Sequence, residues 1–261
     1  MTERRLDGRT AVVTGGGRGI GANVARRLAG QGASVIVTAR TGAEIESVAA
    51  ELRAGGSEAW AVRCDVSDPG SVRAMAEGVG ARLGHVDILV ASAGTATSAP
   101  VGRIALDDWQ RTIAVNATGS LLCIQAFLPA MLERGWGRLI TVASIAGLTG
   151  GKYMGAYAAS KHAVLGLMRC VAAEIAGTGV TANAVCPGYV DTEMTRQSVS
   201  RVREKTRMSA DAALQAIIGQ SRQGRLISPE EVGHTVLALC AEEAASVNGA
   251  TWTIDGGDLL R

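Results

Sequence analysis

The chain has 261 residues, of which 47% are hydrophobic and 19% are charged, and its formal net charge is +2 at pH 7. This composition is sufficient for a large buried core and excludes an intrinsically disordered chain. Because positive and negative residues are nearly balanced, the sequence gives no indication of a nucleic-acid-binding or membrane-binding surface.

The five cysteines are widely spaced, and none belongs to a C-x-x-C motif or lies beside a pair of histidines. We therefore expect reduced thiols and no metal site. The N-terminal residues 1–8 carry charges and lack the apolar region of a signal peptide, and no later apolar run has the length and flanks of a membrane span. These features predict a cytoplasmic protein without a membrane partner.

The first half of the chain alternates between short apolar strands and amphipathic helices. Residues 10–14 (TAVVT) form the first predicted strand, which a glycine-rich turn at residues 15–21 connects to a helix at residues 22–31. The same alternation continues with strands at residues 34–38, 58–64 and 86–91 and helices at residues 43–54 and 69–83. Apolar strands that are each followed by a helix are typical of a parallel sheet covered by helices on both faces.

The second half repeats this alternation and adds one long insertion. Its predicted elements are helices at residues 106–133 and 156–176 and strands at residues 138–143, 180–186 and 249–254. Residues 189–224 are polar and irregularly helical, without a strand pattern. A last helix, to about residue 243, is predicted to begin at Pro229, because Ser228 and Glu231 have the spacing of a capping box.

These seven strands and their helices predict an α/β fold class, a Rossmann-like, doubly wound and mostly parallel seven-stranded sheet with helices on both faces. No internal repeat, low-complexity tract or linker interrupts the chain. We therefore expect one domain over residues 1–261.

The turn after the first strand has the pattern T-G-x-x-x-G-x-G, formed by Gly15, Gly19 and Gly21. Glycine lets the backbone turn sharply and lets a pyrophosphate approach the free N–H groups at the start of the following helix. Between a strand and a helix, this pattern predicts a dinucleotide-binding site rather than a plain tight turn.

Two arginines lie where a dinucleotide-binding site contacts the adenosine ribose. Arg40 follows the second strand, Arg18 lies within the glycine turn, and no carboxylate occurs between Arg40 and Glu44. An acidic residue at this place would select NAD, whereas arginine accommodates the 2′-phosphate of NADP. The two arginines therefore favour NADP over NAD, and the alternative interpretation is two solvated surface arginines.

Two further segments follow predicted strands on the adenosine side. Asp65, after the third strand, can accept a hydrogen bond from the adenine amino group or cap the turn that follows it. Ala91, Ser92, Ala93 and Gly94 end the fourth strand, and their small size allows close packing against adenosine, although a plain loop has the same composition.

The helix at residues 156–176 carries Tyr157 and Lys161 in the pattern Y-x-x-x-K. This spacing places both side chains on one face of the helix, about one turn apart. An ammonium beside a phenol favours the phenolate and lowers its pKa from about 10, which makes the pair a candidate proton donor and acceptor. Ser144, at the end of the preceding strand, can offer its hydroxyl to the same substrate oxygen.

The order of these motifs, with Asn116 among them and a Pro-Gly pair after the strand at residues 180–186, resembles the short-chain dehydrogenase/reductase family over nearly the whole chain. The resemblance implies that Ser144 polarises the substrate carbonyl and that Tyr157 transfers the proton. It implies that Lys161 holds the nicotinamide ribose and lowers the tyrosine pKa. Asn116 would position a water molecule that connects the lysine to solvent.

The same resemblance predicts a set of cofactor-binding residues from the glycine turn to the segment after the sixth strand. They are Gly15, Arg18, Gly19, Ile20, Gly21, Arg40, Asp65, Val66, Ser92, Ala93, Gly94, Tyr157, Lys161, Pro187, Gly188, Val190 and Thr192. The last four are expected to line the nicotinamide, and residues 189–224 are expected to form a lid over the substrate.

One departure from the family pattern occurs at Ala91 and Ser92. Family members usually have two asparagines there, whose side-chain amides brace the central sheet. We expect the Ser92 side chain to replace one of these hydrogen bonds.

The resemblance implies an NADPH-dependent carbonyl reductase, a ketoreductase that acts on a 3-oxoacyl thioester or a polyketide-like ketone. An NAD(P)-dependent alcohol or 3-hydroxy-acid dehydrogenase is the alternative enzyme. A non-catalytic dinucleotide-binding regulator or partner subunit is the alternative outside enzymes. The family also implies a homotetramer formed through the helices at residues 106–133 and 156–176 and the C-terminal strand.

The expected lid carries a run of positive residues. They are Arg196, Arg201, Arg203, Lys205 and Arg207. They form either a solvated helix face or a contact for an anionic substrate arm, such as the phosphates of coenzyme A or of an acyl-carrier phosphopantetheine.

Overall fold

Seven parallel strands form one sheet in the computed structural model, which describes residues 5–206, 208–219 and 221–260. The strands are β1 (Thr10–Thr14), β2 (Ser34–Ala39), β3 (Ala59–Arg63), β4 (Ile88–Ala91), β5 (Gly137–Val142), β6 (Val180–Pro187) and β7 (Thr251–Ile254). Their order across the sheet is β3-β2-β1-β4-β5-β6-β7, so the direction of winding reverses between β1 and β4. The predicted doubly wound fold is therefore confirmed.

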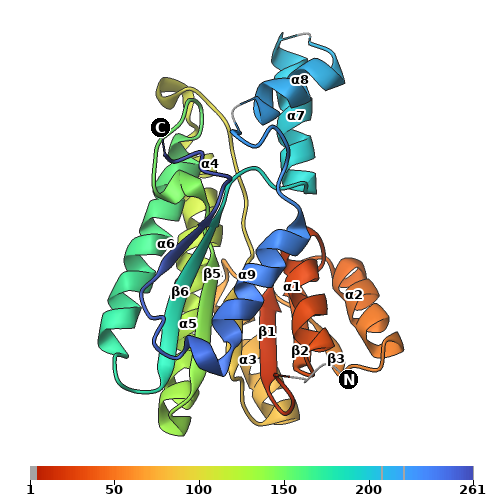
Figure 1. Cartoon of the computed structure of the whole chain (residues 1–261), viewed down its shortest axis with the longest axis vertical. Helices are drawn as coiled ribbons and strands as arrows, with labels where there is room; N and C mark the ends of the chain where they lie inside the picture. The colour runs from red at the N-terminus through yellow and green to blue at the C-terminus, as the bar shows by residue number, and fades with distance from the viewer. Residues whose placement is uncertain (1–4, 207, 220, 261) are drawn as a thin grey trace.

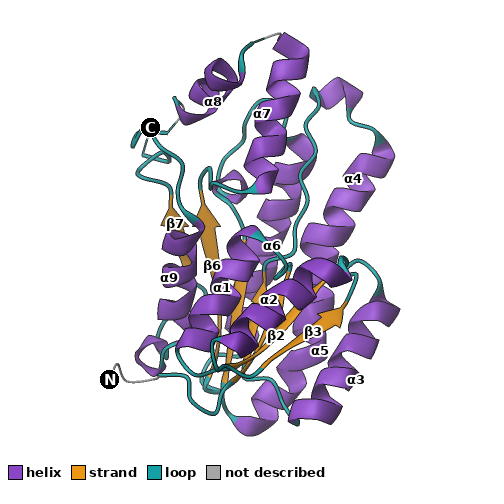
Figure 2. Cartoon of the chain, turned by 90° about the vertical axis from the view of Figure 1, so that its right-hand side faces the viewer, coloured by secondary structure: helices purple, strands orange, loops and turns teal. Residues whose placement is uncertain are grey.

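Helices cover both faces of this sheet, as Figures 1 and 2 show. They are α1 (Gly19–Gly30), α2 (Gly42–Ala54), α3 (Pro69–Leu83), α4 (Leu106–Ile113), α5 (Gly119–Arg134), α6 (Gly155–Glu174), α7 (Glu193–Thr206), α8 (Ala210–Ile218) and α9 (Pro229–Cys240). Val13 belongs to the core that α1, α2 and α9 share, whereas its neighbour Val12 belongs to the core of α3, α5 and α6. Successive strand residues thus enter opposite cores, which explains the apolar strand pattern.

The helical stretch predicted at residues 106–133 is not one regular helix. It consists of α4, a π-helical turn (Ala114–Thr118) and α5. Within the described residues, this continuous span (Leu106–Arg134) is long and apolar enough to cross a membrane, a test of length and composition that the core helices of soluble proteins also pass. Here α5 packs against α3, β4 and β5.

The insertion at residues 189–224 contains two regular helices, α7 and α8, which lie beyond the carboxyl ends of the strands in Figure 1. The base of the insertion is closed by backbone hydrogen bonds. The amide of Asp191 donates to the carbonyl oxygen of Ile227 (2.8 Å), and the amide of Ile227 donates to that of Tyr189 (2.9 Å). Of the positive lid residues, Arg207 lies outside the described residues.

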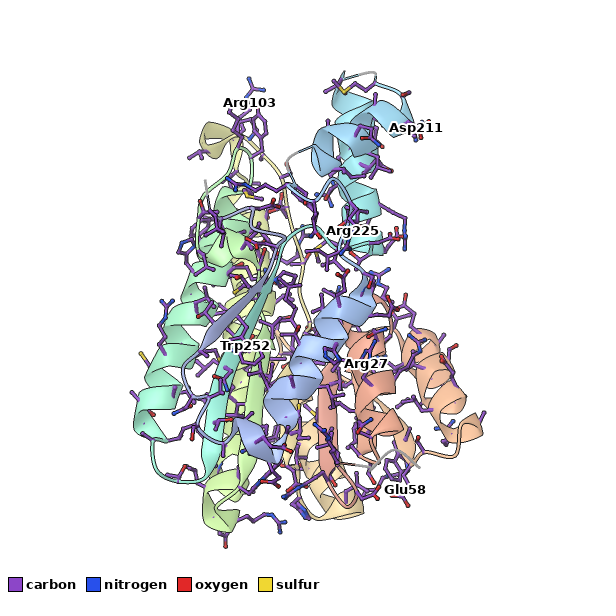
Figure 3. All side chains as sticks on the ribbon, in the orientation of Figure 1. Arg27, Glu58, Arg103, Asp211, Arg225 and Trp252 are labelled. Atoms are coloured by element: carbon purple, nitrogen blue, oxygen red, sulfur yellow. The ribbon has the colours of Figure 1, made fainter. Side chains whose placement is uncertain are left out.

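The chain returns from the insertion at the start of α9, where Figure 3 labels Arg225. The Arg225 guanidinium donates to both carboxylate oxygens of Glu231 (2.8 and 2.7 Å). The predicted capping box is confirmed, because Ser228 and Glu231 each accept a hydrogen bond from the amide of the other. The hydrogen bonds from Arg225 and Ser228 lower the pKa of Glu231 to about 2.

Candidate active site

A cleft of about 700 Å³ opens at the carboxyl ends of the strands, where α1 begins and the chain leaves β6 toward α7. In doubly wound sheets, this edge at the reversal of strand order is where ligands bind. The cleft is lined by every predicted site residue except Asn116, which is buried behind it. Segments that are far apart in the sequence therefore meet at one place.

The glycine turn forms a cradle at the cleft. Gly15 (φ +65°) and Gly19 (φ +54°) have left-handed backbone conformations that favour glycine. A Cβ atom on Gly21 would lie 2.3 Å from the carbonyl oxygen of Gly15, so the turn is too tight for a side chain. Among the described residues, the side chain of the N-cap residue, Arg18, makes no cap hydrogen bond to α1. The first amide groups of the helix are therefore available to an anion, and the cradle fits a pyrophosphate.

The adenosine end of the cleft brings together two arginines and two carboxylates. Arg18 and Arg40 both line the cleft, as predicted, and so does Glu44 in the first turn of α2. Asp65 accepts hydrogen bonds from the amide and the hydroxyl of Ser67 (3.0 and 2.6 Å). These bonds, with a smaller effect of the Arg40 charge, lower the pKa of Asp65. Asp65 thus holds the turn after β3 and also faces the cleft.

The loop after β4 is held by a hydroxyl group of β1. The Thr14 hydroxyl accepts hydrogen bonds from the amides of Ser92 and Ala93, both at 3.1 Å. The loop is thus braced through its backbone, where we expected a hydrogen bond from the Ser92 side chain. Thr14 joins the two central strands at the point where a dinucleotide would cross them.

Ser144, Tyr157 and Lys161 meet at the other end of the cleft. The Ser144 hydroxyl accepts from the amide of Ala146 (3.1 Å), and it is near enough to the Tyr157 phenol to affect the pKa of that phenol. The Nζ atom of Lys161 lies 5.7 Å from the centre of the Tyr157 ring. This Nζ atom donates to the carbonyl oxygen of Val142 (2.8 Å), which holds the lysine side chain against the end of β5.

Burial dominates the pKa values of this tyrosine and lysine. It raises the pKa of the Tyr157 phenol above 10, and the interaction with the Ser144 side chain opposes this change. It lowers the pKa of the Lys161 ammonium from 10.5 to about 8. Burial is therefore the largest influence on the Tyr157 pKa in this structure, and the expectation that the lysine lowers this pKa stays a prediction. A phenol with a raised pKa stays protonated at neutral pH, so the proton that it would donate is present.

Asn116 lies in the π-helical turn and connects the two sides of the cleft. Its Oδ1 atom accepts from the amide of Thr95 (2.8 Å), and its Nδ2 atom donates to the carbonyl oxygen of Thr95 and to the hydroxyl of Ser160 (both 2.9 Å). The Ser160 hydroxyl donates to the carbonyl oxygen of Tyr157 (2.7 Å). Asn116 thus positions the loop after β4 against the first turn of α6. Its role in holding a water molecule stays a prediction.

Sequence reasoning missed several residues that line the open end of the cleft. They are residues 95–98 of the loop after β4 and Asp108 and Arg111 of α4, which form an ion pair at 2.6 Å. Arg201 of α7 lines the same end and donates to the carbonyl oxygen of Ala96 (3.4 Å). No motif relates these residues, because they come from separate elements that only the fold brings together.

The two ends of the cleft define a class of protein. One end offers an anion cradle and arginines for a dinucleotide, and the other offers a half-buried phenol, a buried serine hydroxyl and a buried ammonium. The phenol and the serine can donate a proton and a hydrogen bond to one substrate oxygen. Combined with a hydride-carrying dinucleotide, this is the site of an oxidoreductase.

The sequence comparisons identify the family. The short chain dehydrogenase family matches residues 9–203, and the chain belongs to this family of oxidoreductases. It is 36% identical to the 3-oxoacyl-[acyl-carrier-protein] reductase of Synechocystis sp. over 257 residues, which are 98% of each chain. It is 35% identical to the D-beta-hydroxybutyrate dehydrogenase of Cupriavidus necator over 258 residues, which are 97% of this chain and 98% of the relative.

A solved structure agrees with the fold over almost the whole chain. A variant of actinorhodin polyketide ketoreductase, crystallised with NADPH, matches with a TM-score of 0.92 and 35% sequence identity. The match covers 98% of both chains. The expected family, fold and enzyme class are therefore confirmed.

Proposed function

We propose that this member of the family is an NADPH-dependent carbonyl reductase that reduces the ketone of a 3-oxoacyl thioester or a polyketide-like substrate. The observation that carries this proposal is the meeting of Ser144, Tyr157 and Lys161 in a cleft that also holds the glycine cradle and Arg40. Two relatives named as a 3-oxoacyl-[acyl-carrier-protein] reductase and a polyketide ketoreductase support the substrate class.

The residues of the cleft fit NADPH. The amide groups at the start of α1 would hold the pyrophosphate, and Arg18 and Arg40 would hold the 2′-phosphate. Residues 187–188, Val190 and Thr192 would line the nicotinamide, which supplies the hydride when the cofactor is bound. The preference for NADP is supported by Ala39 and Arg40 at the end of β2, where an NAD site has an acidic residue.

In this proposal, Tyr157 acts as the general acid. During carbonyl reduction, negative charge develops on the carbonyl oxygen, and the phenol donates its proton to that oxygen. The Ser144 hydroxyl donates a hydrogen bond to the same oxygen and stabilises the charge. The Lys161 ammonium, close to the phenol ring, stabilises the phenolate that remains.

A second candidate function is the oxidation of a 3-hydroxy acid or another alcohol with NAD(P)+. The likeness to a D-beta-hydroxybutyrate dehydrogenase favours it. The same residues serve this direction, because the Tyr157 phenolate would accept the proton of the substrate hydroxyl.

Purified protein, NADPH and a panel of ketones test the proposed function through the loss of NADPH absorbance. We expect consumption with a 3-oxoacyl thioester or a cyclic diketone, and slower consumption with NADH. Oxidation of 3-hydroxybutyrate with NAD+, without reduction of any ketone, would establish the second candidate. Binding of NADPH without turnover of any compound in either direction would contradict both.

Substitution of Arg201 would test whether the substrate has an anionic arm. Among the positive lid residues, Arg196 is paired with Asp191 (2.7 Å), whereas Arg201 lines the cleft. We expect Arg201→Glu to raise KM for acetoacetyl-coenzyme A about tenfold and KM for a neutral diketone less than about twofold, because only the thioester brings phosphates to the lid. Steady-state kinetics with both substrates measure this difference.

Arg203→Glu is the matched control, because it makes the same change of charge on an exposed residue of the same helix. We expect it to leave both KM values within about twofold of the wild type. Equal increases for the thioester and the diketone in Arg201→Glu would contradict an anionic arm.

We also propose a cytoplasmic homotetramer formed through α4, α5, α6 and β7. Large apolar side chains on three of these elements are exposed, namely Leu106, Trp109, Leu132 and Trp252. Exposed apolar surface of this kind marks protein contacts. The free cysteines, of which Cys170 is exposed, support a reducing compartment. Light scattering of the purified protein measures the mass of the assembly.

A further inference from the structure

Glu44 lies at the adenosine end of the cleft and has no part in the chemistry described above. Its carboxylate lies 3.9 Å from the guanidinium of Arg18. It also packs against the glycine turn, since a Cβ atom on Gly17 would lie 2.9 Å from its Cβ and 3.3 Å from its Oε2. A negative charge therefore stands beside one of the two arginines that face this end of the cleft.

The local sequence also gives Glu44 the spacing of a capping-box residue. Thr41 and Glu44 have the spacing of a capping box at the start of α2, like Ser228 and Glu231 at the start of α9. Ser228 and Glu231 form the complete box. Among the described residues, the Thr41 side chain makes no cap hydrogen bond. The contacts of Glu44 that the structure shows are therefore those with the glycine turn and with Arg18.

We propose that Glu44 weakens the preference for NADP over NAD by opposing the binding of a 2′-phosphate. This inference rests on the proposed function, in which Arg18 and Arg40 bind the 2′-phosphate of NADP. When NADP binds, Arg18 exchanges the Glu44 carboxylate for the phosphate, and the carboxylate then repels that phosphate. NAD has no such phosphate and needs no such exchange. Glu44 therefore narrows the difference in affinity between NADP and NAD.

The expected effect is one of charge at a partly exposed site, since the Glu44 side chain is 37% exposed. We expect Glu44→Gln to lower the Kd for NADP+ about fivefold and to change the Kd for NAD+ by less than about twofold. The gain should shrink at about 0.5 M salt, because salt screens exposed charges.

Isothermal titration of the wild type, Glu44→Gln and Glu46→Gln with NADP+ and with NAD+ tests this inference. Glu46→Gln is the matched control, because Glu46 lies on the same helix and pairs with Arg53, which does not line the cleft in the described part of the chain. Only Glu44→Gln should raise the ratio of the Kd for NAD+ to the Kd for NADP+. In an Arg18→Gln background most of this gain should be lost, since the competition acts through Arg18.

An unchanged ratio in Glu44→Gln would overturn the inference. Weaker NAD+ binding with constant NADP+ binding would also overturn it, because Glu44 would then bind the ribose 2′-hydroxyl. The proposed NADP preference fails by a different result, namely a wild type that binds NAD+ more tightly than NADP+ and an Arg40→Ala variant that changes neither affinity. A gain of NADP+ affinity in Glu44→Gln would support the inference even then.

Discussion

Replacing Tyr157 with phenylalanine is expected to lower kcat for ketone reduction with NADPH by at least about 100-fold. The phenol is the group placed to give a proton to the carbonyl oxygen, and burial keeps it protonated at neutral pH. Removal of one oxygen keeps the ring, and the hydrogen bond from Lys161 to Val142 does not involve it. The Kd for NADPH should therefore change by less than about twofold, as steady-state kinetics and a fluorescence titration of NADPH would measure together.

Tyr153→Phe is the matched control for this experiment. Tyr153 precedes α6, is 56% exposed and is not among the described residues that line the cleft. The same loss of one hydroxyl should leave kcat within about twofold of the wild type. Wild-type turnover in Tyr157→Phe would exclude this tyrosine as the acid. Loss of NADPH binding together with turnover would instead assign it a structural role.

A methyl group on Gly21 is expected to weaken NADPH binding at least tenfold and to lower the free energy of unfolding by about 2 kcal/mol. The added Cβ atom would lie 2.3 Å from the carbonyl oxygen of Gly15 and 2.8 Å from its carbonyl carbon. Both are backbone atoms that no rotamer change can move away. The turn must therefore open, which displaces the amide groups that would hold the pyrophosphate. Urea denaturation and an NADPH titration of Gly21→Ala measure the two effects.

Gly30→Ala provides the comparison at the other end of α1. Within the described residues, no atom lies within 4 Å of a Cβ atom built on Gly30 outside its own surroundings in the helix. Because alanine favours helix over glycine, stability should stay the same or rise by up to about 1 kcal/mol, with unchanged NADPH affinity. If Gly21→Ala behaved like Gly30→Ala, the close approach to Gly15 would not be a requirement of the turn.

The order of strands and helices could be predicted from the sequence. In a parallel sheet that is covered on both faces, each strand is an apolar run, and such runs can be recognised between the helices. Val12 and Val13 enter opposite cores, so neither position of β1 tolerates a charge. The ends of the elements were less predictable. The strand predicted at residues 58–64 is Ala59–Arg63, because its ends depend on the register with β2.

The break in the predicted helix at residues 106–133 has no local signal. The π-helical turn at Ala114–Thr118 contains neither glycine nor proline. Its conformation accompanies the hydrogen bonds of Asn116 with Thr95 and Ser160, which lie on other elements. A property that depends on partners distant in the sequence cannot be recognised from one segment.

The same distinction applies to the site. The glycine turn and the Tyr157 and Lys161 pair could be predicted, because their spacing lies within one turn or one helix. The contact of Glu44 with Arg18 and the brace from Thr14 could not, since each joins two separate elements. The upward shift of the Tyr157 pKa could not be predicted either, because it follows from burial, and burial depends on the complete fold.

The closed base of the insertion lets substrate recognition and catalytic geometry depend on different parts of the chain. Because the backbone of Ile227 is hydrogen-bonded to both Tyr189 and Asp191, the chain between Asp191 and Ile227 begins and ends at nearly the same point. The entropy of closing such a path grows only slowly with its length, so residues can be added or removed there at little cost to the rest of the fold. Recognition of the substrate can therefore diverge in evolution while β6 and α9, and with them the catalytic geometry, keep their positions.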